Sequence, residues 1–405
     1  MRQGLNRRTL AWTGYAGVAL AASLVVACGG GGGGGGATTT AQMGTLRMAM
    51  TDAPACGYDH VYVTVDRVRV HQNGSAADGD AGWSEIALSS PKRIDLLTLT
   101  NGVLEELGST QLPAGSYSQV RLVLVDNGGT SQLANAVQPT GGALVALSTP
   151  SAQQSGLKLK TNFEVQGGQT ADLLLDFDAC RSVVRAGNSG NYILKPVISV
   201  TPRVSTGIEG YVSTTLTLNG TVVTAQQNGT VIRSSQPDTA GKFTLPSLPA
   251  GSYDVVVTSD GRSTAVVPSV PVTATQSVTL NGTATAILPP TSAMQQVTGT
   301  TSVGSGTATL VTDASVRATQ ALTGGPTVEV AHATVDASTA AYTLRLPAAA
   351  PVKSPFAAGT ALNVTADTAV AGKYRIEATA PNRTLVGQDA DVSTADKVVP
   401  LTFLP

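Results

Sequence analysis

The sequence predicts an all-β protein built from tandem antiparallel β-sandwich domains, and three observations support this fold class. Charged residues make up 13% of the 405 residues and aromatics only 4%, while Gly, Thr, Val, Ala and Ser dominate. This composition is typical of short strands and tight turns. Apolar residues alternate with polar ones through runs such as "YVTVDRVRV", which is the period of a half-buried strand. A chain of this length also exceeds what one hydrophobic core fills, so we expect several small cores.

The first element is an export signal over residues 1–27. Arg2, Arg7 and Arg8 precede an apolar run that ends at Cys28, and this run is short for a stable membrane span. Residues 25–28, "VVAC", resemble the lipobox of bacterial lipoproteins, which implies that Cys28 is the first mature residue and carries the lipid. An uncleaved anchor helix and an ordinary signal peptide are the alternatives.

The second element is a tether over residues 28–43. Gly29 to Gly36 are eight consecutive glycines, a composition typical of a flexible linker. By resemblance to lipoprotein sorting in Gram-negative bacteria, Gly29 in place of Asp after the lipidated Cys implies the outer membrane. We therefore expect a lipid-anchored protein of the cell envelope whose first partner is the membrane itself.

The third element is a β-sandwich over residues 44–203. Val61, Val63 and Val65 share one strand face, but Val68 and Val70 have the opposite parity, so the sequence predicts a bulge near residues 66–67. Several ordered segments resemble a bacterial lipoprotein domain family of unknown function: "TDAPACGYDHVYVTVDRVRVHQ", "IDLLTLTNGVLEELGSTQLPAGSYSQVRLVL", "SGLKLKTNFEVQGGQTADLLLDFDACRSVV" and "YILKPVIS". The resemblance implies a domain and no reaction.

Two further sandwiches are expected after it. Residues 205–286, with "GKFTLPSLPAGSYDVVVTSDG", resemble carboxypeptidase regulatory-like domains, which implies a transthyretin-like (immunoglobulin-like) sandwich. Residues 292–405 form a divergent third body, in which "AYTLRLPAAAP" and "AGKYRIEATAP" echo the second as if the module recurred with an insertion at its turn.

The hexapeptide "LPAGSY" occurs twice, at residues 112–117 and 248–253. Pro fixes φ and Gly tolerates positive φ, so Pro-Ala-Gly makes a tight turn that leads into a strand. We interpret the motif as a strand-entry corner used by two sandwiches, with a surface recognition motif as the alternative.

Residues able to do chemistry are few. Lys and Arg number 25 against 26 Asp and Glu, so the basic footprint of a nucleic-acid binder is missing. The three histidines, His60, His71 and His332, do not have the spacing of paired metal ligands. No nucleophile-elbow or phosphate-loop motif is present, so the chain is predicted to be no enzyme and to need no cofactor.

Carboxylates are the remaining candidates for a site. Asp172, Asp176 and Asp178 have the same parity along "ADLLLDFDAC", and Asp52 can approach from a neighbouring strand. A solvent-exposed strand face explains this pattern. One alternative is a calcium site, and another is a pair of catalytic carboxylates as in glycosidases.

These observations predict a non-catalytic structural or interaction module, with an envelope protein or a polysaccharide as partner and no nucleic acid. Carbohydrate binding is the alternative function, because the second domain resembles sugar-binding modules in fold. Sugar sites stack their ligand on exposed aromatics, and Trp83 is the one Trp of the mature chain because Trp12 lies in the signal peptide.

The three cysteines predict one disulfide. Lipidation uses Cys28, which leaves Cys56 and Cys180 as an even pair in an oxidising compartment. Two unpaired, buried thiols are the alternative.

Overall fold

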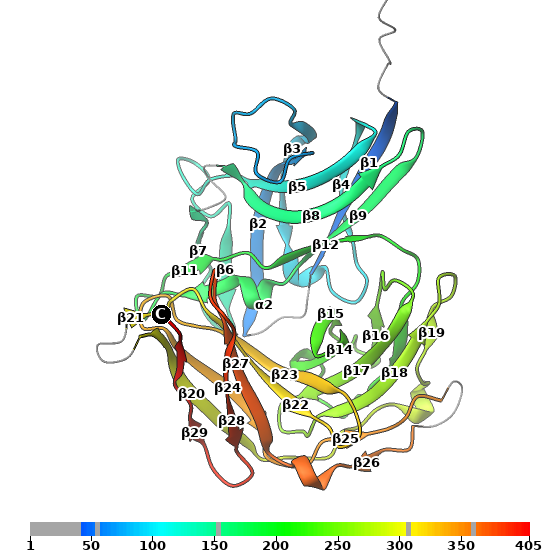
Figure 1. The fold of residues 1–405 in the computed structure, drawn as a ribbon, viewed down its shortest axis with the longest axis vertical. Helices are drawn as coiled ribbons and strands as arrows, with labels where there is room; N and C mark the ends of the chain where they lie inside the picture. The colour runs from blue at the N-terminus through cyan, green and yellow to red at the C-terminus, as the bar shows by residue number, and fades with distance from the viewer. Residues whose placement is uncertain (1–41, 53–56, 151–154, 305–308, 358–361) are drawn as a thin grey trace, which may run out of the picture. The chain divides into compact units, whose positions relative to one another are not determined.

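The computed structural model describes residues 42–52, 57–150, 155–304, 309–357 and 362–405. Strands dominate it, with only short helical turns between them (Figure 1). The predicted signal peptide, Cys28 and all but the end of the tether lie outside the described residues. Within them, no helix is long and apolar enough to cross a membrane.

The all-β prediction is confirmed, and the chain forms successive sandwiches with separate apolar cores. Most strand pairs are antiparallel, but each sandwich also contains parallel pairs such as β1 with β9 and β13 with β19. The sheets are therefore mainly antiparallel with some parallel pairs, because strands distant in sequence, such as β1 and β9, are neighbours in one sheet.

The first sandwich packs two sheets over one core. Its smaller sheet has the order β12 (Ile198–Pro202), β9 (Thr170–Phe177), β1 (Met43–Asp52) and β4 (Glu105–Pro113). Its larger sheet has the order β10 (Val183–Arg185), β11 (Tyr192–Leu194), β7 (Val145–Ser148), β6 (Ala136–Pro139), β2 (Tyr58–His71), β5 (Gly115–Leu124) and β8 (Leu157–Val165), with β3 (Ser84–Asp95) also on β2. Its helical turns include η1 (Leu96–Thr98) and α2 (Ala179–Ser182).

Strand β2 contains the predicted bulge. The pairing of β2 with both β3 and β5 shifts register between Val65 and Arg67, which leaves Asp66 as the extra residue. Val61, Val63, Val65, Val68 and Val70 are all buried as a result, because one extra residue restores the inward parity.

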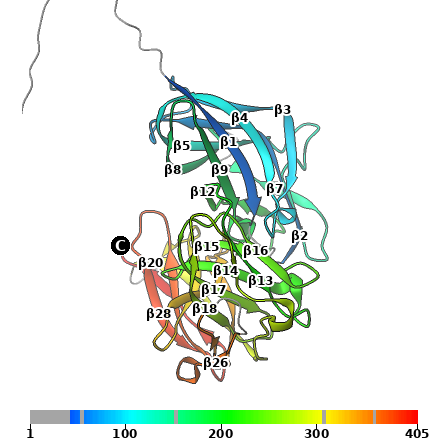
Figure 2. The same ribbon diagram turned by 90° about the vertical axis from the view of Figure 1, so that its right-hand side faces the viewer.

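The second sandwich follows directly from β12. One sheet has the order β16 (Lys242–Leu245), β13 (Ile208–Tyr211) and β19 (Val278–Thr279). The other has β15 (Thr230–Ser235), β14 (Thr221–Gln227), β17 (Gly251–Ser259), β18 (Ala265–Val272), β25 (Val352–Lys353) and β26 (Thr365–Ala366). Figure 2 shows β14, β17 and β18 side by side in this sheet. Its helical turns are η2 (Leu218–Gly220) and η3 (Thr283–Thr285).

The third sandwich contains the remaining strands and the turn η4 (Thr368–Val370). In one sheet, β20 (Met294–Val303) pairs with β21 (Thr309–Leu310), β24 (Ala341–Pro347), β29 (Lys397–Val398) and β30 (Leu401–Phe403). The other sheet has the order β23 (Thr327–Thr334), β22 (Ser315–Ala321), β27 (Lys373–Thr379) and β28 (Val386–Asp391).

The repeated "LPAGSY" motif forms the same corner twice. The Tyr117 hydroxyl donates to the carbonyl of Pro113, and the Tyr253 hydroxyl donates to that of Pro249, each over 2.9 Å. Both tyrosines are 2% exposed. With its tyrosine buried in both copies, the motif is a structural device and not a recognition sequence.

The third sandwich repeats this corner around an insertion. The Tyr374 hydroxyl donates to the carbonyl of Pro347 over 2.7 Å, although residues 348–371 separate the "LP" from the "GKY". Part of the inserted segment leaves its own sandwich. Its strand β25 pairs with β18 of the second sandwich, so the third domain extends a sheet of the second.

Candidate functional site

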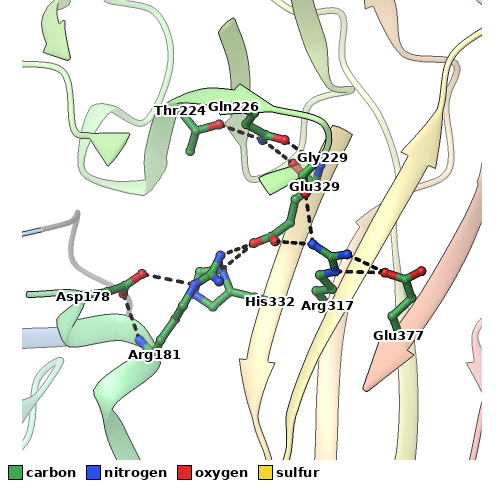
Figure 3. A network of polar contacts seen from close by, with 9 residues as sticks. All are labelled: Asp178, Arg181, Thr224, Gln226, Gly229, Arg317, Glu329, His332 and Glu377. Atoms are coloured by element: carbon green, nitrogen blue, oxygen red, sulfur yellow. Dashed lines mark hydrogen bonds and ion pairs between the residues drawn. The ribbon is translucent and has the colours of Figure 1, made fainter. Parts of the chain in front are cut away.

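Buried polar groups gather where the sandwiches meet, and the largest group surrounds Glu329 on β23. We call this set the Glu329 cluster; it contains Asp178, Arg181, Gln226, Arg317, Glu329, His332 and Glu377 (Figure 3). The pairing of β22 with β23 shifts register between Ala318 and Thr319, so Val330 is an extra residue. Val328 and Glu329 point to opposite faces of the strand and are both buried, because Val328 packs against Val256 and Val266 of the second sandwich and Glu329 faces Arg181.

The Glu329 carboxylate binds cations from two sandwiches. Arg181, on α2 of the first sandwich, makes a short ion pair with Oε1, and Arg317 Nη1 lies 3.7 Å from Oε2. His332 Nδ1 lies 3.6 Å from Oε1 and 3.4 Å from Arg181 Nη2. Arg317 also contacts Glu377 Oε2 at 2.9 Å. The side chain of Glu329 is 4% exposed, whereas those of its cationic partners are 21–30% exposed, so the carboxylate is buried and the cations reach partly into solvent.

A side-chain amide connects the second sandwich to the same residue. Gln226 Nε2 donates to the Glu329 carbonyl, and Gln226 Oε1 accepts from the Glu329 N–H, each over 2.8 Å. Strand β23 is an edge of its sheet, and edge strands present unpaired N–H and C=O groups. The fully buried amide of Gln226 therefore takes the place of a neighbouring strand.

The charges around Glu329 lower the pKa of its carboxyl by more than burial raises it. Burial by itself would raise the pKa of this carboxyl, but the hydrogen bond from His332 and the charges of Arg181, His332 and Arg317 hold its pKa below the ordinary value. Glu329 is therefore an ionised anchor at neutral pH and not a proton donor.

We call a set of buried polar contacts between two sandwiches a joint. The Glu329 cluster is one joint, and a second joint connects the first and second sandwiches. Arg233 on β15 is 2% exposed. It pairs closely with Asp176 on β9 and donates to Thr201 Oγ1 over 3.1 Å and to the Pro246 carbonyl over 3.1 Å. Burial raises the pKa of Asp176, and the Arg233 charge offsets part of that rise.

This joint also contains an amide on a sheet edge. Asn101 Oδ1 accepts from the N–H of Thr244 over 2.6 Å, and its Nδ2 donates to the Lys242 carbonyl over 3.4 Å. Strand β16, which carries both groups, is an edge strand. Each joint thus combines an amide on a free edge with a buried arginine–carboxylate pair.

The first and third sandwiches also meet through two loops. The Gly187 N–H donates to Asp336 Oδ2 over 2.7 Å, and the Ala337 N–H donates to the Arg185 carbonyl over 3.0 Å. Lys195 Nζ donates to the Thr312 carbonyl over 2.6 Å. In each of these contacts, an N–H or ammonium group of one sandwich donates to a carboxylate or carbonyl oxygen of the other.

The four predicted carboxylates face different groups. Asp52 accepts from the Ala179 N–H over 2.9 Å, Asp176 pairs with Arg233, and Asp178 caps α2 and lies 3.1 Å from Arg181 Nε. Asp172 lies 4.0 Å from the nearest guanidinium nitrogens of two arginines. Within the described residues, no three His, Cys, Asp or Glu side chains are grouped to hold a metal ion.

Trp83 packs against two guanidinium groups. The guanidinium carbons of Arg69 and Arg121 lie 4.6 and 4.3 Å from the ring centroid, and Trp83 Nε1 donates to the Ala77 carbonyl over 2.9 Å. The Arg121 side chain has no exposed surface and is paired with Asp78 at 3.1 Å. The structure thus gives Trp83 a local role as the cover of a buried arginine.

The histidines do not share a site. His60 Nδ1 lies 2.5 Å from Asp95 Oδ2, His71 Nε2 lies 2.9 Å from the Ala81 carbonyl, and His332 belongs to the Glu329 cluster. The spacing of the histidines in the sequence did not indicate that His332 belongs to a joint.

Cys56 lies outside the described residues, so its pairing with Cys180 stays a prediction. The register is favourable, because β1 and β9 run parallel and end opposite each other at Asp52 and Phe177. The two cysteines follow these ends by four and three residues.

The main joint residues were not predicted. Gln226, Arg233 and Glu329 lie within alternating strand sequences and have no motif around them. For Arg233 a detectable signal is parity, since it shares a strand face with Val231. Glu329 alternates with Val328 and Val330, so the pattern places it at a polar position and gives no such signal.

Two family models match parts of the chain. Residues 43–196 match "Domain of unknown function (DUF4382)", and residues 207–285 match "Carboxypeptidase regulatory-like domain". The predicted order of these two domains is confirmed. No curated protein matches the chain.

Solved structures give only distant likenesses. A type II cohesin–X-dockerin complex from Acetivibrio cellulolyticus is 25% identical over 22% of this chain and 59% of its own, with a TM-score of 0.18. The Bacillus anthracis TIE protein is 12% identical over 89% of this chain and 50% of its own, with a TM-score of 0.19. A streptococcal ancillary pilin is 11% identical over 90% and 100%, with a TM-score of 0.16. The chain thus spans about half to three fifths of the first two, and none of these scores supports a functional argument.

Proposed function

We propose that this protein is a non-catalytic structural module of the bacterial cell envelope, in which three sandwiches act as one body held at a membrane by a lipid on Cys28. The outer membrane is the proposed location. The observation that carries the proposal is the pairing of buried polar groups across each joint, with Gln226 and Asn101 on the free edges of neighbouring sheets.

The energetics of these contacts favour a fixed arrangement. Separating the second and third sandwiches would expose the edge of β23 and leave Glu329 without its partners from other sandwiches. Because water would replace the lost partners, each hydrogen bond across the joint contributes a net of about 0.5–1.5 kcal/mol, or about 1.5–3 kcal/mol where one group is charged. The carboxylates and the histidine of the Glu329 cluster are thus engaged in the contacts that hold the sandwiches together.

The sequence supports the membrane part of the proposal. The segment before Cys28 resembles a lipoprotein signal, and the glycines after it suit a tether. The proposed partners beyond the membrane are an envelope protein or a polysaccharide that contacts the exposed surface of the sandwiches.

Distance measurements between the outer sandwiches test the single-body proposal. Nitroxide labels at exposed positions 158 and 397 of a soluble Cys28→Ser protein report the separation of the first and third sandwiches by pulsed electron spin resonance. We expect one narrow distance distribution for this protein. The double variant Asn101→Ala/Gln226→Ala removes both edge amides and should broaden it.

A matched control is Gln138→Ala. Its amide bonds to the Gly142 carbonyl over 3.1 Å within a single sandwich, so this variant should keep the narrow distribution. A broad distribution in the protein with intact joints would mean that the sandwiches move independently, and the proposal would be wrong.

A further inference from the structure

A polar hollow of about 600 Å³ lies where turns of the second and third sandwiches meet. Gln227 lines it from the end of β14, Asn228 from the β14–β15 turn, Asp254 from β17 and Ser269 from β18. The third sandwich contributes the turn at residues 324–326. The volume is within the range of small-molecule sites.

A bulge in β18 shapes one side of this hollow. Tyr253 pairs with Val270 and Val255 with Val267, so Pro268 and Ser269 together oppose Asp254. Pro268 has no N–H to give to a ladder, and the bulge accommodates it. Ser269 has φ of +58°, and its N–H donates to Asp254 Oδ1 over 3.0 Å.

Asp254 differs from the carboxylates at the joints. Asp176 and Glu329 meet guanidinium groups, and Asp367 meets the ammonium of Lys353. Asp254 is half-buried, yet the Ser269 N–H is its one hydrogen bond within the described residues. Burial raises the pKa of Asp254, so its carboxylate would gain from further donors.

The rest of the lining supplies both donors and acceptors. Gln227 Nε2 donates to the Ser252 carbonyl over 3.2 Å, which leaves its Oε1 to accept. The Asn228 amide and the hydroxyls of Ser252 and Ser269 add further groups of both kinds. Pro268 and Pro326 form apolar walls.

We propose that this hollow binds a neutral, hydroxyl-rich ligand, namely a sugar unit of a saccharide. Vicinal hydroxyls donate to a carboxylate and both donate to and accept from amides, which matches Asp254, Gln227 and Asn228. An ammonium ion would leave the amide donors unused, and one carboxylate is too few for a calcium site, which takes six to eight oxygens. This inference rests on the proposed function and extends it, because it identifies the residues that would bind the polysaccharide partner.

The joint between the sandwiches sets the position of this site. Arg317 Nη1 donates to the Gly229 carbonyl over 3.0 Å, and Gly229 follows Asn228 in the same turn. The Glu329 cluster therefore holds one wall of the hollow against the other.

Saturation-transfer NMR on the soluble Cys28→Ser protein tests the proposal. The probes are methyl glycosides of glucose, galactose, mannose, rhamnose and N-acetylglucosamine at about 10 mM, where a millimolar site is occupied. We expect transfer to at least one sugar. Asp254→Asn keeps the bond from Ser269 but loses the charge, and it should weaken binding about tenfold.

Two further variants separate the site from the fold. Asn228→Gly removes an amide without strain, since Asn228 has φ of +51°, and it should also weaken binding. Asp260→Asn changes a well-exposed carboxylate of the same sandwich and should not.

Three results would overturn the proposal. They are no transfer to any sugar of the panel, equal binding by Asp254→Asn, and binding that only Trp83→Ala abolishes. If calcium or methylammonium shifts the Asp254 resonances while no sugar binds, the hollow is a cation site. The label-distance experiment is unaffected by these outcomes, so the two proposals fail separately.

Discussion

Replacing the corner tyrosines by phenylalanine should destabilise the sandwiches to different degrees. Tyr117, Tyr253 and Tyr374 each donate one hydrogen bond to a proline carbonyl. Phenylalanine keeps the buried ring and removes the hydroxyl with this bond, together with its side-chain contact to Gln72 at Tyr117 and to Gln320 at Tyr374. The cost therefore depends on whether water can reach the carbonyl that loses its donor.

The burial of the three prolines ranks the expected costs. Pro249 is exposed and Pro113 half-buried, so water can replace part of the lost bond. We expect about 1 kcal/mol for Tyr253→Phe and for Tyr117→Phe, the net value of a typical hydrogen bond. Pro347 is buried, so Tyr374→Phe leaves an unsatisfied carbonyl and should cost about 2–3 kcal/mol.

Pulsed hydrogen exchange along a urea titration, read by mass spectrometry, gives an unfolding midpoint for each sandwich. With a urea dependence of about 2 kcal/mol per molar, a loss of about 1 kcal/mol lowers the midpoint by about 0.5 M. Tyr211→Phe is the control, because the Tyr211 hydroxyl makes no hydrogen bond within the described residues. If Tyr374→Phe costs no more than Tyr253→Phe, or if all three match the control, carbonyl burial does not govern these corners.

The remaining predictions concern the anchor, the joints and the inserted segment. Palmitate labelling should mark the protein, and Cys28→Ser should abolish the label and release the body from membranes; an unlabelled variant that stays membrane-bound would contradict this. Non-reducing peptide mapping should link Cys56 to Cys180, whereas alkylation of both thiols in unreduced protein would refute the pairing. Because the folded-state pKa of Glu329 is lowered, its stabilisation is complete above the unfolded value of about 4.3 and lost as pH falls through the lower folded value; melting curves should show Glu329→Gln less stable than the parent at pH 7, with the gap closing in acid. Ser354→Pro removes an N–H that donates to the Val266 carbonyl over 3.0 Å, so it should lower the urea midpoint of the second sandwich although residue 354 belongs to the third; an unchanged midpoint would mean that β25 adds no stability there.

The sequence by itself determined the features that depend on neighbouring residues. Alternation along β2 predicted both the strand and its bulge at Asp66, because a change of parity can be read within ten residues. The chemistry of Pro-Ala-Gly-Ser-Tyr likewise predicted the strand-entry corner. The echo of the second module in residues 292–405 also suggested an insertion at its turn, and Tyr374 bonds to Pro347 across the inserted residues.

Only the tertiary structure decided what the buried polar residues do. Gln226 and Glu329 are 103 residues apart in the chain, and Arg233 and Asp176 are 57 apart. No local pattern identifies such partners, because a polar residue at a buried parity shows that a partner is needed without showing which one. The same holds for Asp254, whose place in a hollow depends on the bulge opposite it in β18 and on a turn from another sandwich.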